Sequence, residues 1–314
     1  MLFLPFMLFA MWSSCFAIGK MAIFSSTPLF FTAIRMLFAS ILILGFMLLK
    51  KKSQLKVSKK QLGAICLLAV LSMYLNNALE FYGLKYISAS KTCFIYSLTP
   101  IFAAILSYFH FKEKLTPMKI LGMAVALIGI IPVFFMQSGS EKLNSSFFHL
   151  SLPEIAVIVA VFLSVYGWIL LRKLVKDNSV SPLTANGLGM LLGGIFAITH
   201  SLLLDKWSPI PVAAGHSGAF IQGIVFYTII SNVICYNLYG YLLKRFTATF
   251  MSFVGLLSPI FASFSEWILL KTPPSPLILG STCVIIFGLW LVYKAELKQG
   301  YIVKSKKVNE PAVN

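Results

Sequence analysis

Five charged residues, including Lys20, lie inside long apolar stretches of the sequence, and four of them are the first candidates for a chemical role: Arg35, Glu80, Lys91 and Glu266. A charge at membrane depth is costly, so it usually marks the path of a substrate or ion. Cations can bind a carboxylate and carboxylates can bind a cation, so the set predicts a site for a small zwitterion. Two structural alternatives stay open. Lys91, like Lys20, could reach the membrane interface from a helix end, and Arg35 could pair with Glu80 to hold two helices together.

Aromatic and amide side chains extend this candidate site. They are Trp12, Asn76, Asn77, Tyr166, Trp168, Asn232, Tyr236 and Tyr239. Aromatic rings can stack on a substrate ring or face a cation, and amides can bind substrate or hydrogen-bond between helices. Asn76 and Glu80 are spaced to share one helix face. The alternative for every aromatic residue is ordinary packing.

No sequence pattern indicates catalysis, a cofactor or a metal ion. HExxH, GxSxG and P-loop motifs are absent, the four His residues share no face, and the five Cys residues form no CxxC pair. We therefore expect no enzyme activity, no cofactor and no metal. The alternative from another class is an intramembrane enzyme that uses Glu80 and Glu266 as an acid/base pair. Such an enzyme would change its substrate chemically, whereas a carrier would not.

The elements that must hold these residues are membrane-spanning helices. The chain of 314 residues is 59% hydrophobic and 11% charged, with a mean hydropathy of +0.89, and a spanning helix needs ~20 apolar residues. Suitable stretches cover residues 3–23, 28–49, 62–82, 90–110, 118–136, 153–174, 182–204, 218–241, 249–270 and 277–293. The sequence predicts an all-α integral membrane protein with ten transmembrane helices.

The net charge is +17, and the basic residues responsible for it are divided unequally between the two sides of the membrane. If the N-terminus is cytoplasmic, 19 of the 26 Lys and Arg residues fall in the inner loops and the C-terminal tail, and four fall in the outer loops. This bias follows the positive-inside rule. The basic residues therefore set the orientation and meet anionic lipid, and they do not indicate nucleic acid as a partner.

One segment occurs twice. Residues 84–103 recur as residues 243–262, with nine of 20 residues identical. Each copy places a proline, Pro100 or Pro259, within an apolar run, where it frees a backbone carbonyl. Paired proline breaks in two halves of a carrier point to a substrate site at the repeat interface. We interpret both prolines as hinges for alternating access, with packing as the alternative.

The duplication divides the chain into two five-helix repeats. Because five is an odd number, the second copy enters the membrane from the opposite face, which makes the repeats inverted. The expected boundaries are a first repeat at 1–136, an outer linker at 137–151, a second repeat at 152–294 and a cytoplasmic basic tail at 295–314.

Trp12-Ser13-Ser14, the spacing from Pro28 to Arg35, the repeated Leu-Thr/Ser-Pro-Ile-Phe segment and the five-plus-five plan together resemble the EamA-type, ten-helix members of the drug/metabolite transporter superfamily. The resemblance covers about residues 3–293. It implies a carrier of the bacterial inner membrane that moves small solutes by alternating access.

The second copy departs from the first at the charged positions. Gly189 and Tyr239 stand where the first copy has Arg35 and Glu80, so we expect an asymmetric substrate site.

Amino acids fit such a site, and so does S-adenosylmethionine. Its carboxylate would be bound by Arg35 or Lys91, its sulfonium by a carboxylate or an aromatic face, and its adenine by a stacked ring. The resemblance makes exchange of S-adenosylmethionine for S-adenosylhomocysteine the most specific expectation, because some ten-helix members of obligate intracellular bacteria perform it. Export of hydrophobic drugs stays open, as do the direction of transport, coupling to protons and the choice between a monomer and a homodimer.

We expect both termini to lie in the cytoplasm, because of the bias in Lys and Arg. A cysteine introduced within residues 300–314 should therefore resist a membrane-impermeant thiol reagent in intact cells and react after the membrane is opened. Labelling in intact cells would contradict this orientation.

Overall fold

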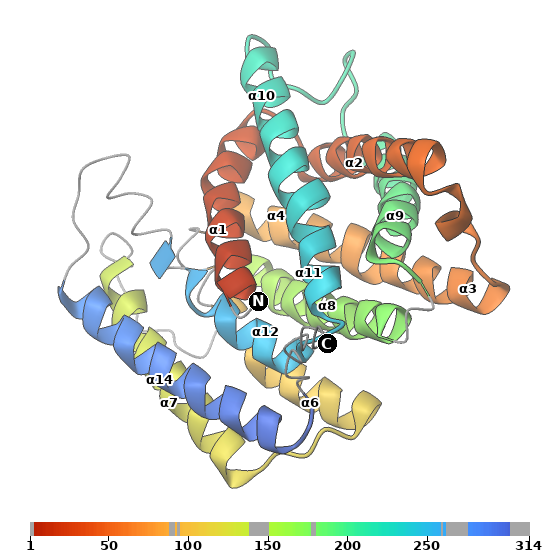
Figure 1. The fold of residues 1–314 in the computed structure, drawn as a ribbon. Helices are drawn as coiled ribbons and strands as arrows, with labels where there is room; N and C mark the ends of the chain where they lie inside the picture. Colours follow the sequence, from red (N-terminus) through yellow and green to blue (C-terminus); the bar gives the residue numbers. More distant parts are fainter. Residues whose placement is uncertain are drawn as a thin grey trace, which may run out of the picture.

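The computed structural model describes residues 3–87, 92, 95–137, 151–176, 180–258, 260–261 and 276–301, and its named elements are helices (Figure 1). One isolated β-bridge joins Ser26 to Val212. Stretches long and apolar enough to cross a membrane cover Pro28–Lys50, Lys59–Tyr86, Leu152–Val175, Pro182–Leu204, Ser217–Leu242 and Gly280–Lys298. The expected all-α class is confirmed in this part of the chain, whereas the number of ten spans stays a prediction.

The helices fall close to the stretches expected from hydropathy. The first half contributes α1 (Phe3–Phe24), α2 (Pro28–Lys50), α3 (Lys59–Leu68), α4 (Asn76–Tyr86), α6 (Thr99–Phe111) and α7 (Pro117–Gln137). The second half contributes α8 (Leu152–Val175), α9 (Pro182–Leu204), α10 (Ser217–Tyr227), α11 (Tyr236–Leu242), α12 (Ala248–Gly255) and α14 (Pro276–Lys298).

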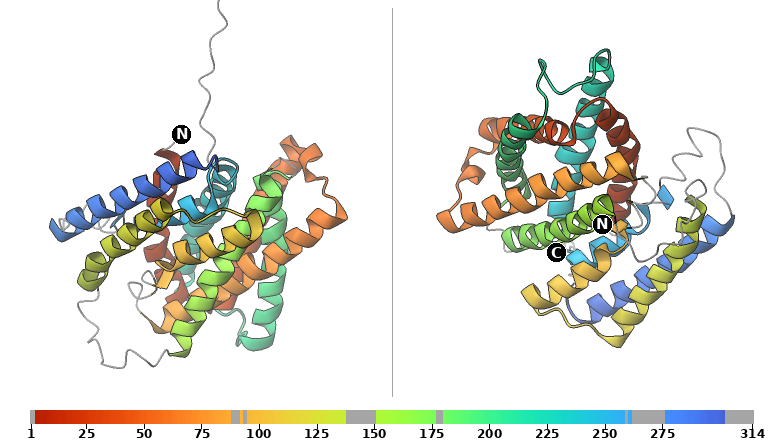
Figure 2. Two further views of the ribbon diagram at one scale, coloured as in Figure 1. Left: turned by 90° about the horizontal axis from the view of Figure 1, so that it is seen from below. Right: turned by 180° about the vertical axis from the view of Figure 1, so that it is seen from behind.

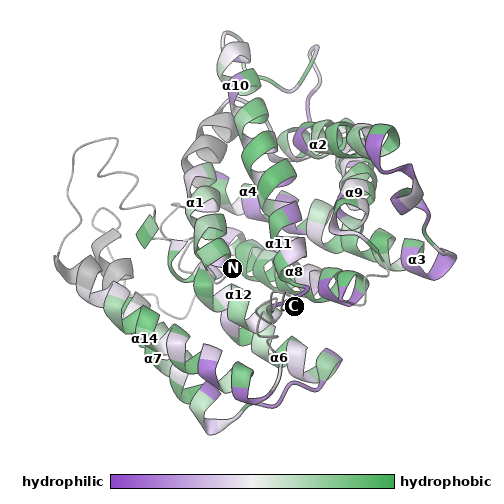
Figure 3. Ribbon diagram, viewed as in Figure 1, coloured by the Kyte–Doolittle hydropathy of each residue, from purple (hydrophilic) through white to green (hydrophobic). Residues whose placement is uncertain are grey.

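The outer surface is apolar in a way that suits lipid. Large side chains stand exposed on the helix flanks, among them Phe109, Leu203 and Leu204. Figure 3 shows hydrophobic residues along most helices, while hydrophilic residues gather at the start of α3 and in the loop before it. Exposed apolar surface of this extent indicates contact with a membrane.

A capping hydroxyl followed by proline starts two equivalent helices, α2 and α9. The Thr27 hydroxyl accepts a hydrogen bond from the backbone N–H of Phe30 at 3.4 Å, and the Ser181 hydroxyl accepts one from Thr184 at 3.1 Å. Proline suits the next position because a helix has no use for its N–H there, and the cap satisfies a free N–H group. The two helices pack against each other.

The last helices of the two halves, α7 and α14, also pack against each other, and they lie side by side at one edge of the molecule in Figures 1 and 2. Gly122 and Gly288 lie at this contact, and a Cβ atom on Gly122 would come 2.8 Å from the Gly288 carbonyl oxygen. Small residues let helix backbones approach closely in membranes. The two halves of the chain thus meet through α7 and α14.

The third and eighth predicted spans share an irregularity of the backbone. A π-helical segment, Ala69–Leu75, connects α3 to α4, and another, Thr228–Cys235, connects α10 to α11. The two segments begin at positions separated by the same spacing as the two copies of the repeated sequence. Such segments are rare and are frequent at functional sites. The duplication seen in the sequence therefore extends to this detail of the structure.

The repeated sequence contains a break in both copies. A turn at residues 97–98 precedes α6, and a turn at residues 256–257 follows α12. Pro100 is the second residue of α6, where a missing N–H leaves no helical hydrogen bond unmade. The interruption therefore lies just before Pro100 and not within one continuous helix. Pro259 lies outside the described residues.

A buried ionic cluster joins the two halves where the α6–α7 connection meets α8, α12 and α14. Lys119 Nζ lies 2.7 Å from Glu296 Oε1 and 4.0 Å from Glu113 Oε2. Arg172 Nη1 donates to Glu113 Oε1 at 2.5 Å, and the Thr247 hydroxyl donates to Glu296. The charged side chains are at most 5% exposed. Charges this deeply buried must be mutually compensated.

We expect Lys119→Met to destabilise the protein by about 3–5 kcal/mol, because removal of one partner leaves the carboxylate of Glu296 buried without a counter-charge. Thermal unfolding of the purified protein in detergent would measure the loss as a lowered midpoint. Lys114→Met is the matched control, since Lys114 is exposed in the connection just before α7. Equal midpoints for the two variants would contradict a stabilising role of the cluster.

Candidate functional site

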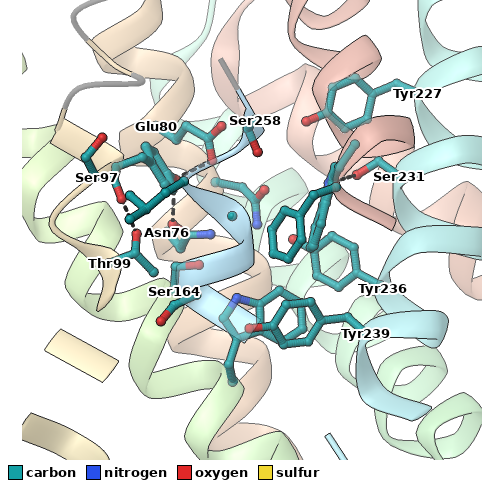
Figure 4. A pocket seen from close by; sticks show the side chains of 18 residues that line it. Asn76, Glu80, Ser97, Thr99, Ser164, Tyr227, Ser231, Tyr236, Tyr239 and Ser258 are labelled. Atoms are coloured by element: carbon teal, nitrogen blue, oxygen red, sulfur yellow. Dashed lines mark hydrogen bonds between the residues drawn. The ribbon is translucent and has the colours of Figure 1, made fainter. Parts of the chain in front are cut away.

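A cavity lies between the two halves, and helices of both contribute to its walls (Figure 4). The volume open to the centres of water molecules is about 140 Å³. This volume is larger than that of the voids in packed protein interiors, which hold a single water. Its lining consists of Phe9, Trp12, Asn76, Asn77, Glu80, Tyr96, Ser97, Thr99, Ser164, Trp168, Tyr227, Ser231, Tyr236, Tyr239, Ser252, Gly255, Leu256 and Ser258.

One wall is a cluster of aromatic rings from α1, α8 and α11, formed by Trp12, Trp168, Tyr236 and Tyr239. The ring centroids of Trp168 and Tyr239 are 4.1 Å apart, and those of Trp12 and Tyr236 are 5.4 Å apart. Trp12 is fixed by a hydrogen bond from its indole N–H to the Ser231 hydroxyl at 3.0 Å. A wall of connected rings can stack on a flat ligand or face a cation.

The facing wall carries a carboxylate. Glu80 on α4 accepts a hydrogen bond from the Tyr96 hydroxyl at 2.8 Å, and the same hydroxyl lies 3.5 Å from Asn76 Oδ1. Figure 4 shows Glu80 and Asn76 across the cavity from Tyr236 and Tyr239. Carboxylate and rings are thus arranged to hold a cationic group between them.

Arg35 on α2 lies behind this wall in a closed cage. It is 0% exposed, and its guanidinium carbon lies 4.8 Å from the ring centroid of Phe81 and 4.7 Å from that of Tyr227. It donates to Oδ1 of Asn77 and, at 3.5 Å, to Oδ1 of Asn232. Within the described residues no carboxylate forms an ion pair with Arg35, and its Nε has no hydrogen-bond partner. A buried charge held only by amides and rings is costly and therefore indicates function.

Asn77 connects Arg35 to the cavity, because it hydrogen-bonds to Arg35 and lines the cavity. Its Oδ1 accepts from Arg35, and its Nδ2 donates to the backbone carbonyls of Ser72 at 2.7 Å and Met73 at 3.1 Å in the first π-helical segment. The regular α-helical hydrogen-bond pattern is interrupted there. Because Asn77 also lines the cavity, one side chain fixes both the irregular segment and the wall.

The second half contains a neutral counterpart of this arrangement. Asn237 Nδ2 donates to the carbonyls of Val233 at 2.8 Å and Asn232 at 3.5 Å, and its Oδ1 accepts from Asn186 Nδ2 at 3.1 Å. An amide from α9 thus supports Asn237 as the guanidinium from α2 supports Asn77. The charge is present only in the first half.

Comparison with known proteins assigns the family. The sequence matches the EamA-like transporter family over residues 1–135 and 151–294. This chain belongs to that family. It is 39% identical over 306 residues to the S-adenosylmethionine/S-adenosylhomocysteine transporter of Chlamydia muridarum, which covers 97% of this chain and 95% of that protein. A protein of the same name from Chlamydia trachomatis serovar L2 is also 39% identical, over 97% of this chain and 92% of that protein.

The fold of this EamA-like transporter is also found among solved structures. One crystal structure has a TM-score of 0.71 to this chain, covering 95% of this chain and 96% of the other, at 14% sequence identity. At that identity the likeness concerns the fold alone. The sequence-based recognition of an EamA-type transporter is confirmed by the family match.

Most of the predicted site residues come together in this EamA-like transporter. Those that line the cavity are Trp12, Asn76, Asn77, Glu80, Trp168, Tyr236 and Tyr239. Arg35 and Asn232 lie directly behind the wall. Lys91 and Glu266 lie outside the described residues.

Tyr166 is placed elsewhere. Its ring packs edge-on against His110, with centroids 5.4 Å apart, and stacks on Phe162 at 6.5 Å, away from the cavity lining. Tyr166 lies on the face of α8 that points toward α6. It is two residues before Trp168, and residues at this spacing lie on nearly opposite sides of an α-helix.

The sequence analysis missed Tyr96 and the small hydroxyl residues of the lining. Tyr96 lies within the repeated segment, residues 84–103, and this position is the signal that could have drawn attention to it. Within the described residues no group of three His, Cys, Asp or Glu side chains could hold a metal ion.

We expect Arg35→Lys to loosen the first π-helical segment, because one ammonium cannot reproduce the forked donation to Asn77 and Asn232. Loss of a buried hydrogen bond to a charged group costs ~1.5–3 kcal/mol, so amide hydrogen exchange in residues 69–77 should accelerate by about tenfold or more. Mass spectrometry of that peptide measures the change. Arg245→Lys, the same replacement outside the cavity, should leave it unaltered; an unchanged exchange rate in Arg35→Lys would end this interpretation.

Proposed function

We propose that this EamA-like transporter exchanges S-adenosylmethionine for S-adenosylhomocysteine across the bacterial inner membrane by alternating access. The observation that carries the proposal is the cavity in which an aromatic wall faces Glu80, in a chain 39% identical to proteins named S-adenosylmethionine/S-adenosylhomocysteine transporter. Transport, and not chemical conversion, fits the family.

The chemistry of the ligand matches the two walls. The sulfonium of S-adenosylmethionine is a cation, for which rings such as Trp12 and Tyr236 and the carboxylate of Glu80 are suitable partners. The adenine is a flat ring that can stack on Trp168 or Tyr239. We expect the carboxylate of the ligand to lie toward Asn77, where the positive charge of Arg35 favours an anion.

An inverted repeat would give the cavity its access to both sides. Contact between equivalent helices, α2 with α9 and α7 with α14, supports a pseudo-twofold relation of the halves. The two π-helical segments and the two turns at equivalent positions support it too. We infer ten spans in two repeats at 1–136 and 152–294, with the linker 137–151 outside and the tail 295–314 in the cytoplasm.

Alternating access requires helices that bend on each side of the cavity. The turns at residues 97–98 and 256–257 border the cavity through Ser97 and Leu256. We propose them, with Pro100 and Pro259, as the paired points of bending. Each break reduces the number of helical hydrogen bonds that a bend must disturb.

Purified protein in liposomes preloaded with S-adenosylhomocysteine should take up radiolabelled S-adenosylmethionine, and empty liposomes should take up far less. Trp168→Ala should raise KM about thirtyfold, since a desolvated cation–π or stacking contact is worth ~2 kcal/mol. Trp290→Ala is the control, because Trp290 is exposed on α14. Uptake of amino acids without uptake of S-adenosylmethionine would refute the proposed substrate.

A further inference from the structure

We propose that Glu80 binds a proton when the cavity holds S-adenosylhomocysteine and releases it when the cavity holds S-adenosylmethionine, so that the exchange moves no net charge. The proposal rests on the proposed function and adds a proton to it as a third transported species. It follows from the placement of a carboxylate in the cavity and from the difference in charge between the two ligands.

Glu80 is the acidic residue among the described side chains that line the cavity; the others are aromatic, amide, hydroxyl or apolar. It is partly buried, and its Oε2 receives a hydrogen bond from Tyr96 at 2.8 Å. An ionised carboxylate in a poorly hydrated site needs a counter-charge, and without one it becomes neutral by binding a proton.

The groups around Glu80 supply no direct ion pair in the described part of the chain. Tyr96, in the segment before α6, donates a hydrogen bond to it, and Tyr227 on α10 and Tyr236 on α11 line the same cavity. Arg35 acts on Glu80 from α2, but its guanidinium hydrogen-bonds to Asn77 and Asn232. Among the described residues no side chain forms an ion pair with Glu80, so a cationic ligand or a proton from solvent can compensate its charge.

The two ligands differ in this respect. S-adenosylmethionine carries a zwitterionic amino-acid end and a sulfonium, so its net charge is +1, whereas S-adenosylhomocysteine has a neutral thioether. The sulfonium can be the counter-charge of ionised Glu80. With S-adenosylhomocysteine a proton from the aqueous phase takes that place, and the loaded cavity has the same total charge in both cases.

The cycle balances in charge and protons. S-adenosylmethionine enters with one positive charge and displaces the proton from Glu80; S-adenosylhomocysteine leaves together with one proton. Without the proton, each turnover would move one charge, and a membrane potential of about 60 mV would change the equilibrium about tenfold. With it, the exchange responds to a pH difference and not to the potential.

The test uses proteoliposomes that contain the full-length protein, S-adenosylhomocysteine and a pH-sensitive dye, with S-adenosylmethionine added outside. Potassium gradients with valinomycin set the potential. For the wild-type protein we expect the lumen to become alkaline as S-adenosylmethionine enters, and we expect final uptake to change less than twofold across potentials of about ±60 mV.

Glu80→Gln should abolish the luminal pH change and make uptake of S-adenosylmethionine dependent on potential. Its KM for S-adenosylmethionine should rise by about tenfold or more, because truncating one partner of a buried charge pair is costly, while exchange of S-adenosylhomocysteine for itself should persist. Glu154→Gln, at the exposed start of α8, is the control and should behave as the wild type does.

The outcomes separate the two proposals. Exchange by the wild type that follows the potential and leaves the luminal pH constant would overturn the proton coupling and leave the proposed exchange intact. Absence of any exchange of the two ligands by folded wild-type protein would overturn the proposed function itself. Since both results come from the wild type, they hold even if Glu80→Gln does not fold.

Discussion

Every backbone polar group inside a bilayer must find its partner within the protein, because lipid offers none, and this constraint shapes the cavity. Two of the stretches that line the cavity, residues 59–86 and 217–242, each contain a π-helical segment. In both, the side-chain amide of an asparagine just beyond the segment donates hydrogen bonds to backbone carbonyls within it. These residues are Asn77 in the first half and Asn237 in the second. The irregular backbone is thus tolerated because side chains cover it, and the same side chains are held in place by the helix beside them.

The two halves use this arrangement with different side chains, so the two sides of the cavity differ in charge. Arg35 supports Asn77, whereas the amide of Asn186 supports Asn237. The first half therefore brings a buried positive charge and, on the same helix as Asn77, the carboxylate of Glu80. The second half brings the rings of Tyr236 and Tyr239. A ligand with one cationic, one anionic and one flat part meets a different surface at each end.

Hydropathy and the internal repeat were sufficient to predict the helical class and seven of the 18 residues that line the cavity, since apolar length and polar residues within apolar stretches are direct consequences of the bilayer. They could not reveal that Arg35 is held by Asn77 and Asn232 and not by Glu80. That depends on the π-helical segment, which rotates the residues after it and has no signature in hydropathy. The ionic cluster of Glu113 and Arg172 was missed for a related reason: charges at helix ends look the same in sequence whether they face water or another helix.

The ionic cluster also bears on how the chain is made. Lys119 is synthesised early, yet the carboxylate closest to it, that of Glu296, belongs to the last helix. During translation the lysine must remain hydrated or be shielded until α14 has been inserted, because a lone buried ammonium is costly. Completion of this end of the protein is therefore a late event in biogenesis. A chain that ends before Glu296 would leave Lys119 with the more distant carboxylate of Glu113, 4.0 Å away, which is already bound by Arg172.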